Sequence, residues 1–147
     1  LERAGYFERT MDKLIAVTAL AVVVAAATYL VALGGGALVR PHVARKFLGG
    51  FATTRRLHFT ELALRVLVGA ALIISAPRLA FGAALLVFGW VLVVTSIGLA
   101  LVPWRWHQRF ASWSVPRATQ YLPLIGVASL IGGAALLVVV ILPHAPV

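Results

Sequence analysis

Glu61 and Arg65 are the residues whose types and spacing come closest to a chemical function. Glu61 is the only acidic residue after Asp12, and Arg65 follows it by four positions inside a largely apolar segment. At this spacing, with the acid first, two side chains lie on one face of a helix and can pair. Charges inside a membrane often mark a path for protons or ions. Glu61 is therefore a candidate proton carrier, with Arg65 beside it and His58 supplying protons from the membrane interface.

A structural role is the alternative for this ion pair. The uninterrupted apolar run 66–76 has only eleven residues, about half of what a transmembrane helix requires. The helix must therefore include the two preceding turns, which places Glu61 and Arg65 inside the membrane near one edge. Arg65 can then extend toward the headgroups. Because no charged residue lies inside the other predicted spans, we favour a pair that neutralises a short span over a proton relay.

Other catalytic chemistries lack their usual residues. The chain has no cysteine, which excludes disulfides, thiolate metal sites and cysteine nucleophiles. Its four histidines lie near the ends of predicted spans, whereas haem inside a membrane is usually held by facing histidines within the helices. They are His42, His58, His107 and His144. We therefore predict no catalytic residue, no metal and no cofactor, and a protein that is not an enzyme.

The composition indicates an integral membrane protein. The chain is 62% hydrophobic and 12% charged, with a mean hydropathy of +1.01, whereas soluble domains have about 25% charged residues. A membrane-spanning helix needs roughly 20 apolar residues. Four segments are candidates for such helices: 14–39, 58–76, 79–102 and 121–142. We predict an all-α membrane protein in which residues 1–147 form one domain with four transmembrane helices.

Positive charge lies mainly in two of the connections between these spans. The basic residues are Arg40, Arg45, Lys46, Arg55 and Arg56 in the first connection, Arg78 in the second, and Arg105, Arg109 and Arg117 in the third. The positive-inside rule places the first and third connections in the cytoplasm and both termini outside. The apolar run after Lys13 begins like a signal peptide, but it continues through Leu33, so we expect it to be kept as the first span.

The two basic connections and their flanking spans resemble one another. Each connection begins with proline and then spaces apolar residues at helical intervals, which is typical of a short helix in the headgroup region. The matching elements are Ala-Leu-Val at 37–39 and 100–102, Pro at 41 and 103, and Gly-Ala-Ala-Leu at 69–72 and 133–136. Their separation of 62 to 64 residues indicates two tandem units of helix, interfacial segment and helix. Chance similarity between apolar sequences is the alternative.

Aromatic and basic residues cluster in the third connection. They are Trp104, Arg105, Trp106, Arg109, Trp113 and Arg117. Tryptophan favours the membrane interface, so anchoring is the simplest interpretation. Interfacial arginines beside such rings also favour a site for an anionic lipid such as cardiolipin.

Small residues form stripes on the last two predicted spans. They are Gly82 and Gly89 on the third span and Gly126, Ser129 and Gly133 on the fourth. In lipid, such surfaces allow helices to approach closely, within one chain or between subunits. The glycines at 34–36 can break or bend the first span, and a bend is the more ordinary use.

The region around the second unit resembles a group of small bacterial inner-membrane proteins of uncharacterised families. The resemblance lies in 89–92, in the run Val-Pro-Trp-Arg-Trp-His at 102–107, and in 124–136. Proteins of this type have two spans joined by a short basic Pro-Trp turn. The resemblance covers about a third of the chain and implies a bacterial inner membrane without any assigned activity.

These observations favour an accessory subunit of a larger inner-membrane assembly, for example an energy-converting one. The expected partners are anionic membrane lipids and other membrane protein subunits or a second copy of the chain. The charge of +9 is expected to meet lipid headgroups and not nucleic acid, because the basic residues flank apolar spans. The alternative is a small transporter or channel for ions, protons or a solute that uses Glu61.

Overall fold

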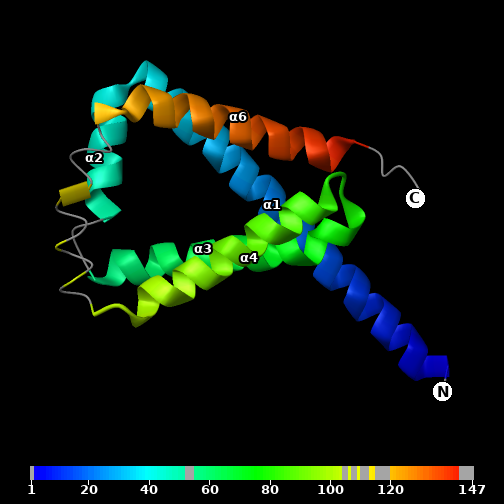
Figure 1. Ribbon diagram of the computed structural model, residues 1–147. Helices are drawn as coiled ribbons and strands as arrows, with labels where there is room; N and C mark the ends of the chain where they lie inside the picture. Colours follow the sequence, from blue (N-terminus) through cyan, green and yellow to red (C-terminus); the bar gives the residue numbers. More distant parts are fainter. Residues whose placement is uncertain are drawn as a thin grey trace.

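The computed structural model describes residues 2–51, 55–103, 106, 109, 113–114 and 120–142, and these residues form helices and short turns without any strand. In this part of the chain, four helices are long and apolar enough to cross a membrane. They are α1 (Glu2–Val39), α3 (Arg55–Ser75), α4 (Gly82–Leu101) and α6 (Leu122–Ile141). The predicted all-α class with four membrane-spanning helices is confirmed (Figure 1).

The helices begin and end where the backbone chemistry changes. In a membrane every peptide group needs an internal partner, which favours continuous helices through the apolar segments. α1 ends at Val39, because Pro41 disfavours a helical residue before it. α1 begins at Glu2, well before the apolar run, and it remains helical through the glycines at 34–36. Of the two uses considered for these glycines, the break does not occur.

The short helix α2 (Pro41–Phe51) occupies the first of the two predicted interfacial segments. It starts with proline at the position where a helix tolerates it best. Ala44 of α2 is buried with Ala37 of α1 and Leu122 of α6 in a small apolar cluster. Val43 and Phe47 are exposed, as are the basic side chains beside them. The second interfacial segment lies mostly outside the described residues.

A tight turn joins α3 to α4. A 3-10 turn, Ala76–Arg78, is followed by Phe81, which adopts the left-handed conformation with φ 58°. Gly82 lies so close to the Ala76 carbonyl oxygen that a side chain there would collide with it. The glycine at 82 is therefore required by the turn. It does not form a helix-packing stripe with Gly89, which differs from the expectation from sequence.

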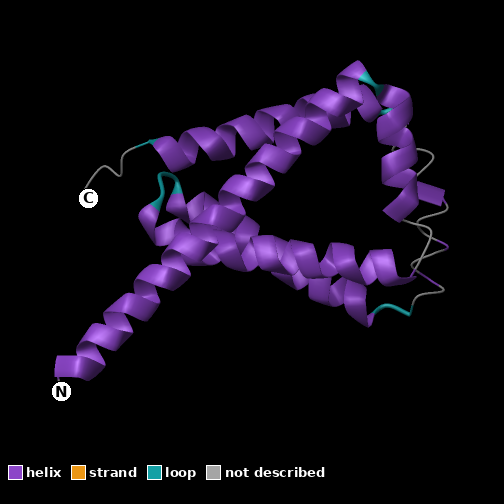
Figure 2. Ribbon diagram, turned by 180° about the vertical axis from the view of Figure 1, so that it is seen from behind, coloured by secondary structure: helices purple, strands orange, loops and turns teal. Residues whose placement is uncertain are grey.

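The four long helices pack as two pairs, α1 with α6 and α3 with α4. Figures 1 and 2 show that the pairs converge near the α3–α4 turn and diverge toward α2. The main core lies at the convergent end. Its buried residues are Ala19 and Val23 of α1, Ala71 and Leu72 of α3, Ala76 and Leu79 of the turn, and Leu85 of α4. At the divergent end, which we call the basic end, lie Arg40, Arg45, Lys46, Arg55 and Arg56.

Burial follows the internal repeat. The buried residues of α4 are Leu85, Gly89 and Ser96. The residues 62 positions earlier are also buried, in α1, and they are Val23, Ala27 and Gly34. The buried residues of α6 are Leu122, Gly126 and Gly133. The residues 64 positions earlier are also buried, in α3, and they are His58, Leu62 and Gly69. The two halves thus present the same helix faces to their neighbours.

The same contact also recurs in both helix pairs. An added Cβ at Gly69 would lie 2.8 Å from the Gly89 carbonyl oxygen and 2.8 Å from Val93 Cγ2. At Gly133 it would lie 2.7 Å from the Ala27 carbonyl oxygen and 2.8 Å from Val31 Cγ2. The first helix of each half therefore packs on the second helix of the other half. The recurrence of this contact at equivalent positions of the two halves supports the predicted tandem repeat.

Candidate functional site

Glu61 and Arg65 form the one ion pair found among the described residues. Arg65 Nη1 lies 3.7 Å from Glu61 Oε1, with the two residues four positions apart on α3. The pair is open to its surroundings, because 44% of the Glu61 side chain and 37% of the Arg65 side chain are exposed. A separation of 3.7 Å is longer than a good hydrogen bond. The pairing within α3 therefore leaves hydrogen-bonding capacity on both groups.

The structure places this pair farther from the start of its helix than the predicted span 58–76 does. α3 begins at Arg55, so a rise of 1.5 Å per residue puts Glu61 about 9 Å and Arg65 about 15 Å along the helix. The whole helix of 21 residues is about 31 Å long. Arg65 therefore starts near the middle of α3 and not near its edge, and the paired Glu61 lies one turn closer to the basic end.

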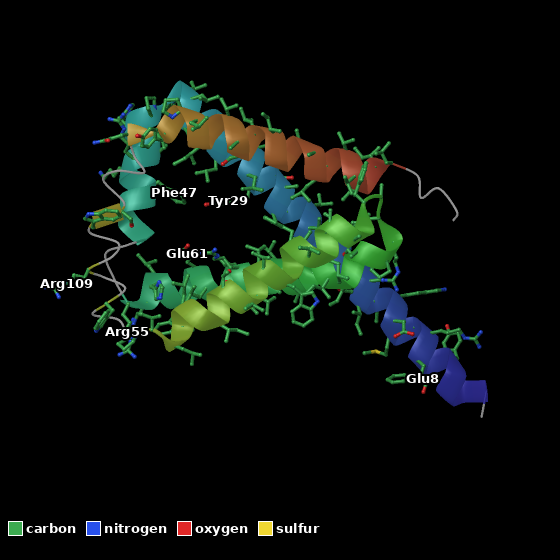
Figure 3. All side chains as sticks on the ribbon, in the orientation of Figure 1. Glu8, Tyr29, Phe47, Arg55, Glu61 and Arg109 are labelled. Atoms are coloured by element: carbon green, nitrogen blue, oxygen red, sulfur yellow. The ribbon has the colours of Figure 1, made fainter. Side chains whose placement is uncertain are left out.

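Tyr29 of α1 faces this pair. Figure 3 shows the Tyr29 and Glu61 side chains directed toward one another across the space between α1 and α3. Tyr29 is 50% exposed. The sequence contains no signal that links residues 29 and 61, because only the crossing of two helices brings them together. We call Tyr29, Glu61 and Arg65 the polar face.

His58 is buried and does not sit at a solvated interface. Its ring meets the Phe59 ring edge-on, with centroids 5.5 Å apart and an interplanar angle of 61°. The expectation that an interfacial histidine supplies protons to the pair does not fit this position, because His58 shares the buried face of α3 with Leu62 and Gly69. His42 is exposed on α2, while His107 and His144 lie outside the described residues.

Within the described part of the chain, no three histidine, aspartate or glutamate side chains come together as metal ligands would. The expectation that the chain carries no metal stays a prediction from sequence.

A second group of functional interest lies at the start of α3. Arg55, Arg56, Phe59 and Thr60 line an open depression at the basic end. The Arg55 guanidinium carbon lies 5.6 Å from the centroid of the Phe59 ring, a geometry typical of a cation–π contact. No acidic residue is present in the first turn of α3. The depression therefore presents two cations beside an aromatic ring.

The predicted aromatic and basic cluster of the third connection is only partly described. Trp106, Arg109 and Trp113 are exposed helical residues, and Figure 3 shows Arg109 at the same end of the molecule as Arg55. Trp104, Arg105 and Arg117 lie outside the described residues. A lipid site in this connection stays a prediction.

The small residues on α4 and α6 face helices of the same chain. Gly89 meets Gly69 of α3, and an added Cβ at Gly126 would lie 3.1 Å from Ala37 Cβ of α1. Ser129 is half-buried between Gly126 and Gly133. The structure thus places these contacts inside the bundle. Gly34 and Gly69, which the sequence reasoning did not assign to packing, supply the opposite surfaces.

No protein-family model, curated protein or solved structure matches this chain. Two features of the molecule itself bear on its function: the polar face between α1 and α3 and the basic depression at the start of α3.

Proposed function

We propose that this chain is a non-catalytic accessory subunit of a larger assembly in a bacterial inner membrane, and that the polar face contacts its partner. The observation that carries the proposal is a half-exposed ion pair inside a membrane-spanning helix. Charged residues at the centre of a membrane helix cost about 2.5 to 3.5 kcal/mol each on insertion scales, and they normally face protein or water. A partner helix that covers the polar face would supply that environment.

The internal repeat argues that the fold itself does not need the pair. The positions in α6 that correspond to Glu61 and Arg65, 64 residues later, are Ile125 and Ser129. α6 buries the same three positions as α3 and forms the same contact with its neighbour, yet it carries no charge. The pair is therefore a special feature of α3, which favours a contact role over a purely structural one.

The unused bonding capacity of the pair indicates the chemistry of the partner. Arginine has five N–H donors and a carboxylate has about four acceptor sites, and a single 3.7 Å approach satisfies few of them. A transmembrane helix with a polar or charged side chain at this depth would donate to Glu61 and accept from Arg65. Tyr29 adds a hydroxyl on the α1 side of the same surface.

Three threonine hydroxyls in the spans give little support to a transport path. Thr28, Thr60 and Thr95 each donate to a carbonyl four residues earlier in their own helix, at 2.8, 3.0 and 2.5 Å. Hydroxyls that are engaged with their own backbone are poor relay groups. A contact surface is therefore a better use of the polar face than a channel or transporter.

The proposal places the basic end in the cytoplasm. Among the described residues, five lysines and arginines from Arg40 to Arg56 lie at that end together with Arg109, against Arg78 at the α3–α4 turn. The N-terminal extension of α1 carries Arg9 and Lys13 toward the other end, but Glu8 and Asp12 accompany them. This distribution favours the orientation with both termini outside.

An exchange of the two charges tests the proposal. In the double variant Glu61→Arg/Arg65→Glu, the intrahelical pair and the net charge are kept, while a partner would meet the opposite charges. We expect the parent to run in a larger assembly after mild detergent extraction from cells that express it at native level, and the exchanged variant to run apart from it in native mass spectrometry. Arg78→Gln is the control.

Two results would contradict this function. The first is a parent chain that always runs alone or as a simple homo-oligomer. The second is an exchanged variant that assembles as well as the parent. Thermal unfolding of the isolated variant separates loss of contact from loss of fold, because a folded variant that no longer assembles has lost only its partner.

A further inference from the structure

We propose that the start of α3 binds one anionic phospholipid, with the phosphate at Arg55 and Arg56 and an acyl chain along the outer face of the helix. The site is the open depression lined by these two arginines, Phe59 and Thr60. The proposal does not depend on the accessory-subunit function, because it concerns a different face of α3.

The position of the depression suits a lipid headgroup. Arg55 and Arg56 are the first residues of a helix that is long and apolar enough to cross the membrane. They are therefore at the level where phosphates of the bilayer lie. Both side chains are exposed, and the stacking of Arg55 on the Phe59 ring holds its guanidinium beside the depression. Arginine binds phosphate oxygens through several directed N–H groups at once.

The charge around the depression favours an anionic lipid over a zwitterionic one. The first turn of α3 has no acidic residue. Glu61, the nearest acid in the sequence, lies on another side of the helix and is paired with Arg65. An ammonium group of a zwitterionic lipid would therefore meet two arginines and no carboxylate.

The surface below the depression suits an acyl chain. Ala63, Leu67 and Ile74 follow Phe59 at spacings that keep them on the same face of α3, and all are exposed. This apolar strip continues from the depression toward the α3–α4 turn. The polar face with Glu61 and Arg65 points elsewhere, so one helix carries a lipid strip and a separate contact surface.

Lipid retention by the full-length protein tests the site. The protein is equilibrated with vesicles of equal amounts of phosphatidylglycerol and phosphatidylethanolamine, extracted in mild detergent, and analysed by native mass spectrometry. We expect phosphatidylglycerol to be retained in preference. In Arg55→Gln/Arg56→Gln its retention should fall by at least about fivefold, the effect expected for the loss of one or more interfacial cations. Phe59→Leu should weaken retention to a smaller degree.

The matched control is Arg45→Gln/Lys46→Gln, which removes the same charge from α2 at the same end of the molecule. It should retain phosphatidylglycerol close to the parent level. Equal losses in the two double variants would overturn the proposal, since the basic end would then attract lipid only through its general charge. Equal retention of both lipids by the parent would also overturn it. Lipid retention is measured on the isolated chain. A negative result there would overturn the lipid site and would say nothing about the contact role of Glu61, which the assembly experiment tests separately.

Discussion

Individual glycines set the distance between the helices. Gly132 and Gly133 are neighbours on α6, but only Gly133 faces α1. An added Cβ at Gly133 would meet the Ala27 carbonyl oxygen at 2.7 Å, whereas nothing lies within 4 Å of one at Gly132. In membranes, where helix association depends on close packing, such a contact has a large effect on stability.

The two glycines therefore predict opposite effects of the same substitution. Gly133→Ala should lower the free energy of unfolding by about 1 to 3 kcal/mol, the usual cost of overpacking. Gly132→Ala should leave it unchanged or raise it by up to about 1 kcal/mol, because alanine loses less backbone entropy in a helix. Denaturant unfolding in detergent micelles measures both values. Similar effects at the two positions would mean that α1 and α6 do not pack through Gly133.

At the scale of elements, α3 and α6 are two versions of one helix with different surfaces. Three of the six buried positions of α3 recur in α6 at a separation of 64 residues, but α3 adds the ion pair and the arginines at its start. α1 also packs against α3, whereas α4 and α6 contact each other little. Differences of this kind are expected when a repeated scaffold acquires a surface in one copy only.

The repeat supplies its own test of what the ion pair does. Replacing it with the residues of α6, in Glu61→Ile/Arg65→Ser, should leave insertion and thermal stability unchanged or improved, because apolar residues often replace internal ion pairs without loss. The variant should nevertheless no longer be found in the larger assembly. Membrane yield, thermal unfolding and native mass spectrometry provide the three measurements. Failure of this variant to insert or fold would show that the pair is structural.

At the scale of the whole molecule, the basic end and the α3–α4 turn lie on opposite sides of the four spans (Figures 1 and 3). The chain contains no cysteine, so single introduced cysteines report their side directly. His42 of α2 and Phe81 of the turn are both exposed. Replacing either residue does not change the number of lysine and arginine residues on the two sides.

Labelling of these cysteines in intact bacterial cells tests the orientation. A membrane-impermeant maleimide should react with Phe81→Cys, which we place outside, and should react with His42→Cys only after permeabilisation. The positive-inside rule provides the reason, since the connection that contains His42 carries five basic residues. The reverse pattern would place both termini in the cytoplasm.

Much of the architecture follows from local features of the sequence. The four spans, the short helix α2 and the repeat are recognisable because hydropathy, proline positions and spacing act along the chain. The pairing of Glu61 with Arg65 also follows from helical spacing alone. The role of Gly82 was missed, because it depends on the Ala76 carbonyl that the turn brings against it.

Only the tertiary structure decides which helices meet. It pairs α1 with α6 and α3 with α4, buries His58, and places Tyr29 opposite Glu61. Apolar helices in lipid gain little from burial against one another, so their partners are chosen by the fit of small residues across distant parts of the chain. The sequence by itself determines that this protein has four apolar helices with one internal ion pair, and the fit between glycines determines where that pair points.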